Sequence, residues 1–258
     1  MTGAAVGRMM IEIDGAGPPV VFVPGLGATS NSFQPLLAAL GGFRCIRLDL
    51  PGSGRSPLPL GGVSIEGFAA EVAEAIAAVA GGPAHLVGHS RGALVCQHVA
   101  ARTPEHVASL ALFGPIVEPT DASRQRLKDR AKIARVEGMI GVADAVVAGG
   151  LSSSAKSANP LLAAYVRESH MRQDPEGFAQ SCEALAAAQG ADLRGLRAPT
   201  LIVTGDEDAV APPSAAQALA DRVKGAKVKV LEHCGHWTPL ERPADCARLL
   251  AEHLRALG

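Results

Sequence analysis

Short apolar runs alternate with alanine-rich helical stretches along most of the chain. The strand-like runs are apolar at consecutive rather than alternate positions, and they cover 43–48, 84–87, 107–113, 200–204 and 227–231. Helical spacing is clearest at Phe68, Val72 and Ile76 within 64–80, and further helices are expected at 90–102, 213–223 and 243–257. Strands that are apolar on both faces and alternate with helices predict a mostly parallel sheet covered by helices on both sides.

The beginning of the chain has a different pattern. Two short apolar runs, 9–13 and 20–23, flank a segment at 14–17 that contains two glycines. This arrangement predicts a hairpin that enters the sheet.

The strand pattern is interrupted once, between 118 and 195. Helical stretches fill this segment, broken by Gly149-Gly150 and by a serine-rich loop at 152–157. Because both ends of the segment return to strands, we expect one core domain made of 1–117 and 196–258, with 118–195 inserted as a helical cap.

Charge and composition limit the possible partners of this 258-residue chain. Its 24 basic and 25 acidic side chains give a formal net charge of −1, with no run of like charges, so nucleic acids and anionic membranes are not expected as partners. The longest apolar runs are strand-length, shorter than the roughly 20 residues that a membrane-spanning helix needs. Segment 1–10 has no apolar signal region, which predicts no secretory signal and a cytoplasmic protein.

The five cysteines have no C-x-x-C spacing and are scattered along the chain (Cys45, Cys96, Cys182, Cys234 and Cys246). This distribution argues against a disulfide framework and against a structural zinc site, so we expect buried thiols and no metal.

The chemistry-bearing segment is Gly88-His89-Ser90-Arg91-Gly92, which follows a buried strand and opens a helix. A G-x-S-x-G sequence in this context predicts a nucleophile elbow, because glycines avoid Cβ collisions in a tight turn that raises the serine above the sheet. A serine hydroxyl needs a general base, and the base needs an orienting carboxylate.

The rest of the chain supplies both groups in the order serine, acid, histidine. Asp208 follows the strand-like run at 200–204, and His236 follows the run at 227–231. Both positions are at carboxyl ends of strands, where open α/β sheets place their sites. Asp206 and Glu207 are adjacent alternatives to Asp208, and a comparison of Asp208→Asn with Asp206→Asn would test the choice.

Three further segments accompany the elbow in chain order. They are 48–56 (LDLPGSGRS), 205–212 (GDEDAVAP) and 235–243 (GHWTPLERP). Together these motifs resemble those of the α/β-hydrolase family over nearly the whole chain. The resemblance implies the α/β-hydrolase fold, with Ser90 as nucleophile, Asp208 as orienting acid, His236 as base, and neither metal nor cofactor.

Two subfamily resemblances point to different substrates. Segments 135–139, 174–178 and 182–185 in the insertion resemble those of 3-oxoadipate enol-lactonases, as does 210–213, whereas 234–237 (CGHW) resembles carbon–carbon bond hydrolases of ring-fission products. The first implies a small lactone or carboxylic ester as substrate, and the second a vinylogous diketone. A third possibility is a ligand receptor that keeps the fold without hydrolysis.

The chain departs from the family pattern at two positions next to the nucleophile. Relatives often carry His-Gly after the first parallel strand, but this chain has Pro24 there, and proline has no N–H to donate. We therefore expect the N–H groups of Leu26 and Arg91 to form the oxyanion hole. Arg91 replaces a usually apolar residue, and it would favour an anionic substrate if its side chain faced the pocket.

Aromatic residues make up only 3% of the chain, so those near the expected site are candidate pocket residues. We expect substrate contacts from five residues around the oxyanion loop, the cap and the histidine (Gly25, Phe33, Tyr165, Phe178 and Trp237). A pocket lined mainly by Ala, Val and Leu would select small aliphatic acyl groups by shape. The expected partner is a small molecule, and the oligomeric state is left open.

Overall fold

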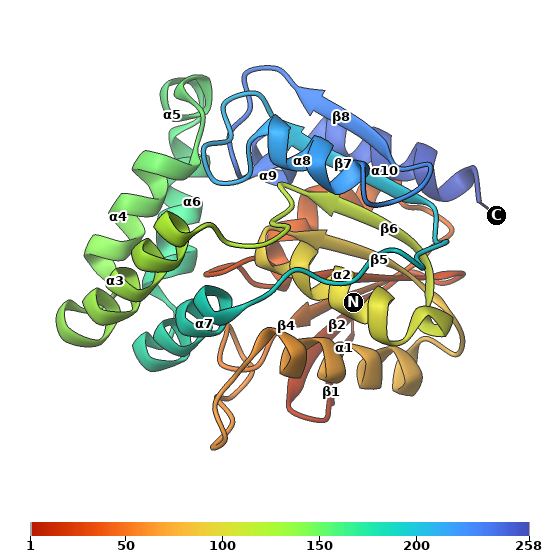
Figure 1. The fold of residues 1–258 in the computed structure, drawn as a ribbon, viewed down its shortest axis with the longest axis horizontal. Helices are drawn as coiled ribbons and strands as arrows, with labels where there is room; N and C mark the ends of the chain where they lie inside the picture. The colour runs from red at the N-terminus through yellow and green to blue at the C-terminus, as the bar shows by residue number, and fades with distance from the viewer. Residues whose placement is uncertain (1, 258) are drawn as a thin grey trace.

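The computed structural model describes residues 2–257, and in this part of the chain eight strands form one sheet in the order β1-β2-β4-β3-β5-β6-β7-β8. The strands are β1 (Thr2–Val6), β2 (Met9–Asp14), β3 (Pro19–Val23), β4 (Arg44–Asp49), β5 (Ala84–His89), β6 (Val107–Phe113), β7 (Thr200–Gly205) and β8 (Lys227–Leu231). From β4 across to β8, neighbouring strands are parallel. The expected mostly parallel sheet is confirmed (Figure 1).

The helices connect these strands and cover both faces of the sheet. They are η1 (Ser30–Ala39, a 3-10 helix), α1 (Ile65–Val79), α2 (Arg91–Arg102), η2 (Pro104–His106, a 3-10 helix), α3 (Asp121–Glu137), α4 (Met139–Gly150), α5 (Ser153–Ala158), α6 (Pro160–Met171), α7 (Pro175–Ala187), α8 (Pro213–Ala220), α9 (Thr238–Glu241) and α10 (Pro243–Arg255). Within 2–257, none of them combines the length and the apolar character needed to cross a bilayer. The first residue of segment 1–10 and the last residue of 196–258 lie outside the described residues.

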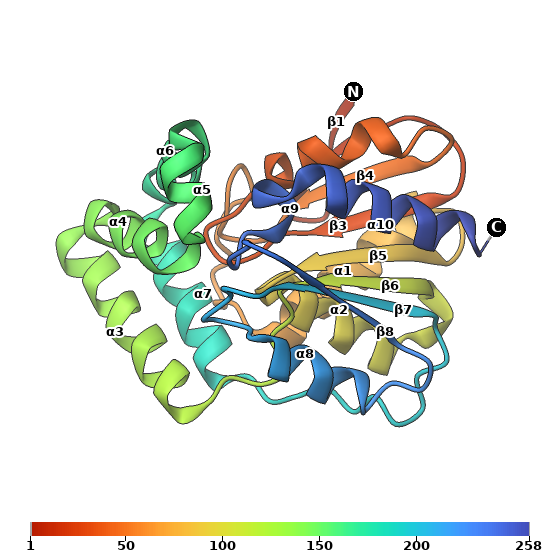
Figure 2. The ribbon, with the colours of Figure 1, turned by 90° about the horizontal axis from the view of Figure 1, so that it is seen from above.

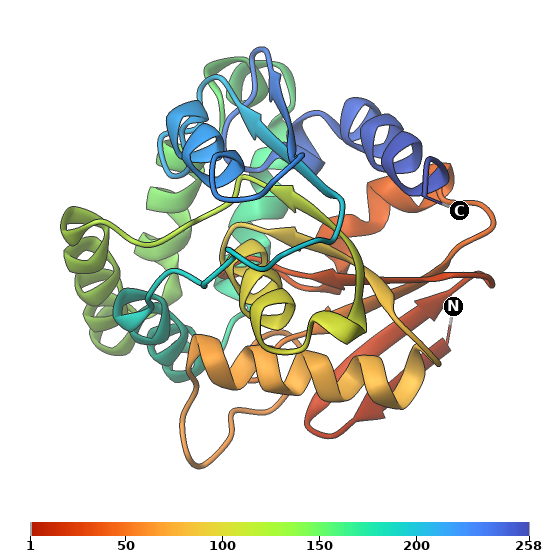
Figure 3. The ribbon, with the colours of Figure 1, turned by 45° about the vertical axis from the view of Figure 1, so that its right-hand side comes forward.

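Successive side chains of the central strands enter two different cores, which explains their uninterrupted apolar runs. In β5, Leu86 belongs to a core shared with α1 and α2, whereas Val87 belongs to a core shared with η1 and α10. Figure 3 shows the two layers, with the dark blue α10 on one side of the sheet and the orange α1 on the other. Burial on both faces is what a parallel sheet requires.

The predicted hairpin between 9–13 and 20–23 is wrong. β2 pairs antiparallel with β1 and with β4, while β3 lies on the far side of β4 and is parallel to it. The glycines between β2 and β3 allow a close crossing instead of a tight turn, since a Cβ on Gly15 would lie 2.4 Å from the Phe43 oxygen and one on Gly17 would lie 2.0 Å from the Gly42 oxygen. β1 is an exposed edge strand of small residues, so its sequence carries little apolar signal.

Helices α3 to α7 follow β6 and precede β7 in the chain. In space they form a group beyond one end of the sheet (Figure 2). Here α3 packs against α7 and α4 packs against α6. All of these helices lie within 118–195, the segment expected to be a cap. The group covers the carboxyl ends of the strands, because residues from both regions line one cavity.

Candidate active site

Ser90 lies on a strained turn between β5 and α2. Its backbone has φ 54° and ψ −118°, and its N–H donates to the Phe113 oxygen at 2.9 Å. A Cβ on Gly92 would lie 2.0 Å from the Val23 oxygen, and one on Gly88 would lie 2.6 Å from the Gly92 oxygen. Glycine is therefore required at both positions by close backbone approach, as the elbow motif predicts, and the serine side chain is presented above the sheet.

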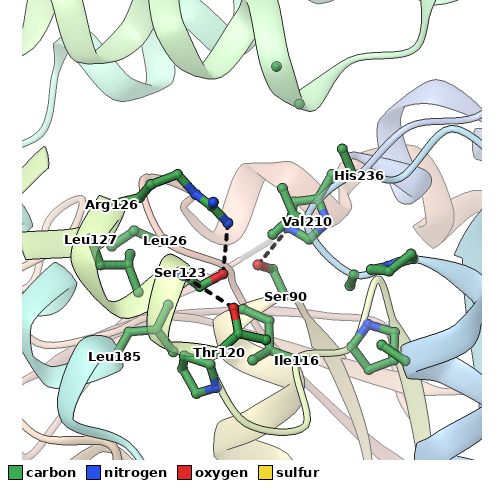
Figure 4. A pocket seen from close by; sticks show the side chains of 18 of the residues that line it. Leu26, Ser90, Ile116, Thr120, Ser123, Arg126, Leu127, Leu185, Val210 and His236 are labelled. Atoms are coloured by element: carbon green, nitrogen blue, oxygen red, sulfur yellow. Dashed lines mark hydrogen bonds between the residues drawn. The ribbon is translucent and has the colours of Figure 1, made fainter.

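Three side chains from the ends of β5, β7 and β8 form a continuous hydrogen-bonded chain. Ser90 Oγ lies 2.7 Å from His236 Nε2, and His236 Nδ1 lies 2.9 Å from Asp208 Oδ2. Because a carboxylate only accepts, Nδ1 carries the proton and Nε2 is left to accept from the serine hydroxyl. Figure 4 shows Ser90 and His236 meeting at the cavity wall. The arrangement can move a proton from the serine oxygen to the histidine.

The structure distinguishes Asp208 from its acidic neighbours. Asp208 is 2% exposed and its Oδ1 accepts from the N–H groups of Val210 and Ala211, whereas Asp206 and Glu207 are exposed. Burial by itself would raise the pKa of the Asp208 carboxyl. The adjacent His236 and the two main-chain donors outweigh burial and hold that pKa below its ordinary value, which keeps the carboxylate ionised.

The loop that carries His236 is held by Glu241. One carboxylate oxygen of Glu241 accepts from the N–H of Trp237, and the other accepts from the N–H groups of Gly235 and Ser152. Ser152 belongs to the cap, so one side chain links the histidine loop to the cap. The His236 N–H adds a second link, to the Gly150 oxygen at 2.8 Å.

The two main-chain N–H groups expected to form the oxyanion hole are those of Leu26 and Arg91. The Arg91 N–H is at the first residue of α2, and no carbonyl or side chain within 2–257 accepts from the Leu26 N–H. Leu26 and Ser90 line the same cavity. Unpaired donors beside a nucleophile are suited to bind negative charge on a substrate oxygen.

The cavity above Ser90 has a volume of about 730 Å³ and lies between the sheet and the cap. Its walls are mostly aliphatic, with contributions from the loops after β3, β6 and β7 and from α3, α4 and α7 (Leu26, Ile116, Val117, Leu127, Ala145, Val146, Leu185, Val210 and Ala211). This agrees with the expectation of a pocket lined by small aliphatic residues.

Most of the expected aromatic contacts are not in the cavity wall. Trp237 lines the cavity, but Phe33, Tyr165, Phe178 and Gly25 do not. Phe33 is fully buried against Phe22 in the core under α10, and Phe178 is buried between α7 and the sheet. Tyr165 packs where the cap meets the core domain, in a cluster that includes Ala28 and Trp237. These aromatic residues are close to site residues in the sequence or lie in the cap, but their side chains face buried clusters instead of the cavity.

The Arg91 side chain does not line the cavity either. It is fully buried below the nucleophile, and its Nη2 donates to the Gly25 oxygen at 3.1 Å. Arg91 is therefore not the cation that an anionic substrate would meet.

Cations do line the cavity, on a helix that the sequence left unassigned. Arg126 and Arg130 are one turn apart on α3, and within 2–257 neither forms an ion pair with a carboxylate. Arg126 donates to Ser123 Oγ at 2.9 Å, as Figure 4 shows. Glu118 also lines the cavity, but it is paired with Arg124 at 3.0 Å. No motif marks these arginines, so only their four-residue spacing could have indicated that they share a helix face.

Two buried histidines complete the site without belonging to the proton chain. His89 donates from Nε2 to the His236 oxygen at 2.8 Å, and burial together with nearby His236 lowers its pKa to about 3. His170 of α6 bonds the Val166 oxygen through Nδ1 at 2.8 Å, and burial lowers its pKa to about 4. Both line the cavity as neutral rings packed against Trp237.

Comparison with known proteins agrees with this geometry. The family model described as "alpha/beta hydrolase fold" matches residues 18–243. The chain belongs to the α/β hydrolase fold family. This α/β hydrolase is 32% identical over 255 residues to a pimeloyl-[acyl-carrier protein] methyl ester esterase of Chromobacterium violaceum, which covers 96% of this chain and 98% of that protein.

Solved structures of other hydrolases have the same fold. The enol-lactonase from Burkholderia xenovorans LB400 matches with a TM-score of 0.91 and 29% identity, over 98% of this chain and 100% of that chain. A thermophilic esterase from Thermogutta terrifontis matches with a TM-score of 0.91 and 25% identity, over 98% and 96% of the two chains. The family resemblance inferred from the sequence motifs is confirmed.

Proposed function

We propose that this α/β hydrolase cleaves small lactones or carboxylic esters through an acyl-Ser90 intermediate. One observation carries the proposal: the hydrogen-bonded chain from Ser90 Oγ through His236 to the buried Asp208, beside a cavity of about 730 Å³. The esterases and the enol-lactonase among its relatives support ester chemistry.

The reaction follows from the contacts of the three side chains. His236 Nε2 takes the hydroxyl proton as Ser90 Oγ bonds to the substrate carbonyl carbon, and the N–H groups of Leu26 and Arg91 bind the resulting oxyanion. When the tetrahedral intermediate collapses, the bond to the leaving oxygen breaks and His236 returns the proton to that oxygen. His236 then takes a proton from water as the water oxygen bonds to the acyl carbon. When this second tetrahedral intermediate collapses, the bond between the acyl carbon and Ser90 Oγ breaks, His236 returns the proton to Ser90 Oγ, and the acid is released.

The lining of the cavity supports a substrate with a small aliphatic acyl part and a carboxylate away from the scissile bond. Aliphatic side chains surround Ser90, and the unpaired guanidinium groups of Arg126 and Arg130 lie on the α3 side. Arginine binds carboxylates through two parallel hydrogen bonds. A carboxylated ester or lactone would place its charge there.

The proposal is tested with Ser90→Ala and a generic aryl ester. We expect the native enzyme to give a burst of one phenolate per active site, and Ser90→Ala to lose the burst and at least about 10⁴-fold in kcat. Full activity of Ser90→Ala would contradict the mechanism, and a native protein without turnover would favour a ligand receptor.

Carbon–carbon bond hydrolysis is the second candidate. The observation that favours it is Trp237, which follows His236 in the CGHW run and lines the cavity. A lactone and ester panel assayed beside a panel of ring-fission diketones separates the two. Turnover of the diketones alone would contradict the lactonase proposal.

A further inference from the structure

Arg91 is a buried cation whose charge has no counter-ion in the folded chain. Its side chain is fully buried, it forms no ion pair within 2–257, and its Nε and Nη1 have no hydrogen-bond partner. The Cys182 thiol interacts electrostatically with Arg91, but burial raises the pKa of that thiol to about 12, so the thiol is neutral and balances no charge. Burial also lowers the pKa of Arg91, but only to about 10, so the guanidinium stays charged at neutral pH.

An unpaired buried charge destabilises a fold, so a buried arginine next to the nucleophile indicates a functional role that compensates for this cost. Part of the cost is offset by Phe68, whose ring centre lies 4.9 Å from the guanidinium carbon. The remaining contact is the informative one: Nη2 donates to the Gly25 oxygen at 3.1 Å.

Gly25 O and Leu26 N–H belong to the same peptide group. No cis peptide occurs in the described residues, so this carbonyl and this N–H point in opposite directions. Arg91 holds the carbonyl end from inside the core, which directs the N–H end away from Arg91. The group is packed on the elbow, since a Cβ on Gly25 would lie 3.2 Å from the Ser90 Cβ.

We propose that Arg91 is a positioning residue for oxyanion binding: its guanidinium holds and polarises the Gly25–Leu26 peptide, whose N–H then binds the substrate oxygen as it becomes negative. This inference rests on the proposed function and adds a residue to it. A carbonyl that accepts from a cation makes the N–H of its peptide a stronger donor. A donor strengthened in this way stabilises the negatively charged transition state more than the neutral substrate.

The competing explanation is that the loop holds itself. The Gly25 oxygen also accepts from the Ala28 N–H, at 3.3 Å, and this turn could orient the peptide without Arg91. The two explanations differ in what the loss of the charge does. If Arg91 were only structural, its removal would lower stability and activity together. If Arg91 acts on the transition state, its removal would lower activity without lowering stability.

The experiment compares Arg91→Met, Arg91→Lys and the control Arg44→Met with the native enzyme. Arg44 also donates to a main-chain oxygen, that of Ala80, at the opposite end of the sheet from the site. Three quantities are measured: the midpoint of urea unfolding, the acylation rate in the aryl-ester burst, and the dissociation constant of benzeneboronic acid. Boronic acids add a serine oxygen to boron and form a tetrahedral anion, so their binding reports on the oxyanion site without turnover.

For Arg91→Met we expect acylation to be about 100-fold slower, boronate binding to weaken by a similar factor, and KM to change less than threefold. The unfolding midpoint should be equal to or above that of the native enzyme. Arg91→Lys keeps the charge without the planar guanidinium, so it should recover part of the loss and remain at least fivefold slower than native. Arg44→Met should keep native acylation and boronate binding.

If the native enzyme is active and Arg91→Met keeps native acylation and native boronate binding, the proposal for Arg91 is overturned while the proposed function stands. A fall in the unfolding midpoint with unchanged boronate binding would also overturn it. If Arg91→Met does not yield folded protein, Arg91→Lys decides, and a native acylation rate in that variant overturns the proposal. A native protein with neither a burst nor Ser90-dependent boronate binding would contradict the proposed function itself.

Discussion

At the scale of single residues, burial decides which of several chemically similar groups can act. Asp206, Glu207 and Asp208 are consecutive acids, yet only Asp208 is buried and within 3 Å of His236. The same holds for the histidines, since His89 faces the main-chain oxygen of His236 while His236 faces Ser90. Role follows from what each side chain touches.

The substitution Asp208→Asn tests this assignment. We expect kcat to fall by about 10³–10⁴-fold with little change in KM, because an amide that donates to Nδ1 favours the histidine tautomer that cannot accept the serine proton. Asp206→Asn is the matched control, since Asp206 is exposed and its carboxylate accepts from main-chain N–H groups, that of Cys234 at 3.1 Å among them. It should change kcat less than tenfold, measured with the same ester, and equal losses in both variants would refute the assignment.

At the scale of elements, the cap helices add cationic and imidazole side chains to a cavity that the sheet loops line with mostly aliphatic residues. α3 contributes the two unpaired arginines, and α6 contributes His170 against the oxyanion loop. The fit is close, because Gly27 has φ 72° and a Cβ there would lie 2.2 Å from His170 Nε2. The cap and the oxyanion loop are therefore packed as one unit, and the cap contributes to both binding and positioning.

Substitutions on α3 test whether the arginines bind a substrate carboxylate. We expect Arg126→Ala and Arg130→Ala each to raise KM about tenfold for an ester with a remote carboxylate, which corresponds to about 1.4 kcal/mol of lost binding. KM for a neutral ester of the same length should change less than twofold. Lys128→Ala is the control, because Lys128 is exposed on the same helix and does not line the cavity. Equal effects on both esters would show that the arginines do not recognise charge.

At the scale of the whole molecule, buried neutral histidines link stability to pH. His89 and His170 have pKa values of about 3 and about 4 in the fold, below the ordinary value of 6.5. Below pH 6.5 the unfolded chain therefore binds protons that the folded chain does not. The free energy of unfolding must fall as the pH decreases through this range.

Urea unfolding between pH 4.5 and 7.5 measures this effect. Each such histidine should contribute a slope of up to about 1.4 kcal/mol per pH unit between its folded pKa and 6.5, with stability greater at the higher pH. His170→Gln removes one of these groups, so its unfolding free energy should depend less steeply on pH by about that amount. An unchanged slope in this variant would contradict the assignment of His170 as a neutral buried ring.

Much of the fold and the core of the candidate site could be read from local sequence. Apolar runs on consecutive positions predict strands buried on both faces, and the elbow glycines are required by collisions between atoms a few residues apart or on the adjacent strand. The positions of Asp208 and His236 follow from the same logic, because residues after parallel strands meet at one edge of a sheet.

Other features depend on contacts between segments that are distant in the chain, and no local sequence pattern indicates which segments meet. In the sequence, Gly15 and Gly17 indicate a hairpin turn. The structure shows that they instead allow close contact with the main chain at Gly42 and Phe43. The expected aromatic contacts of Phe33 and Phe178 were wrong because helices present two faces, and only the tertiary structure decides which face meets the cavity.

The sequence by itself determined the family, the fold class and the three residues proposed for catalysis, because these rest on short-range sterics and on the order of strands. The tertiary structure decided how the cavity is lined and which way Arg91 points. Those outcomes depend on how the cap helices pack over the sheet, where small differences in orientation move a side chain from solvent into the cavity or from the cavity into the core.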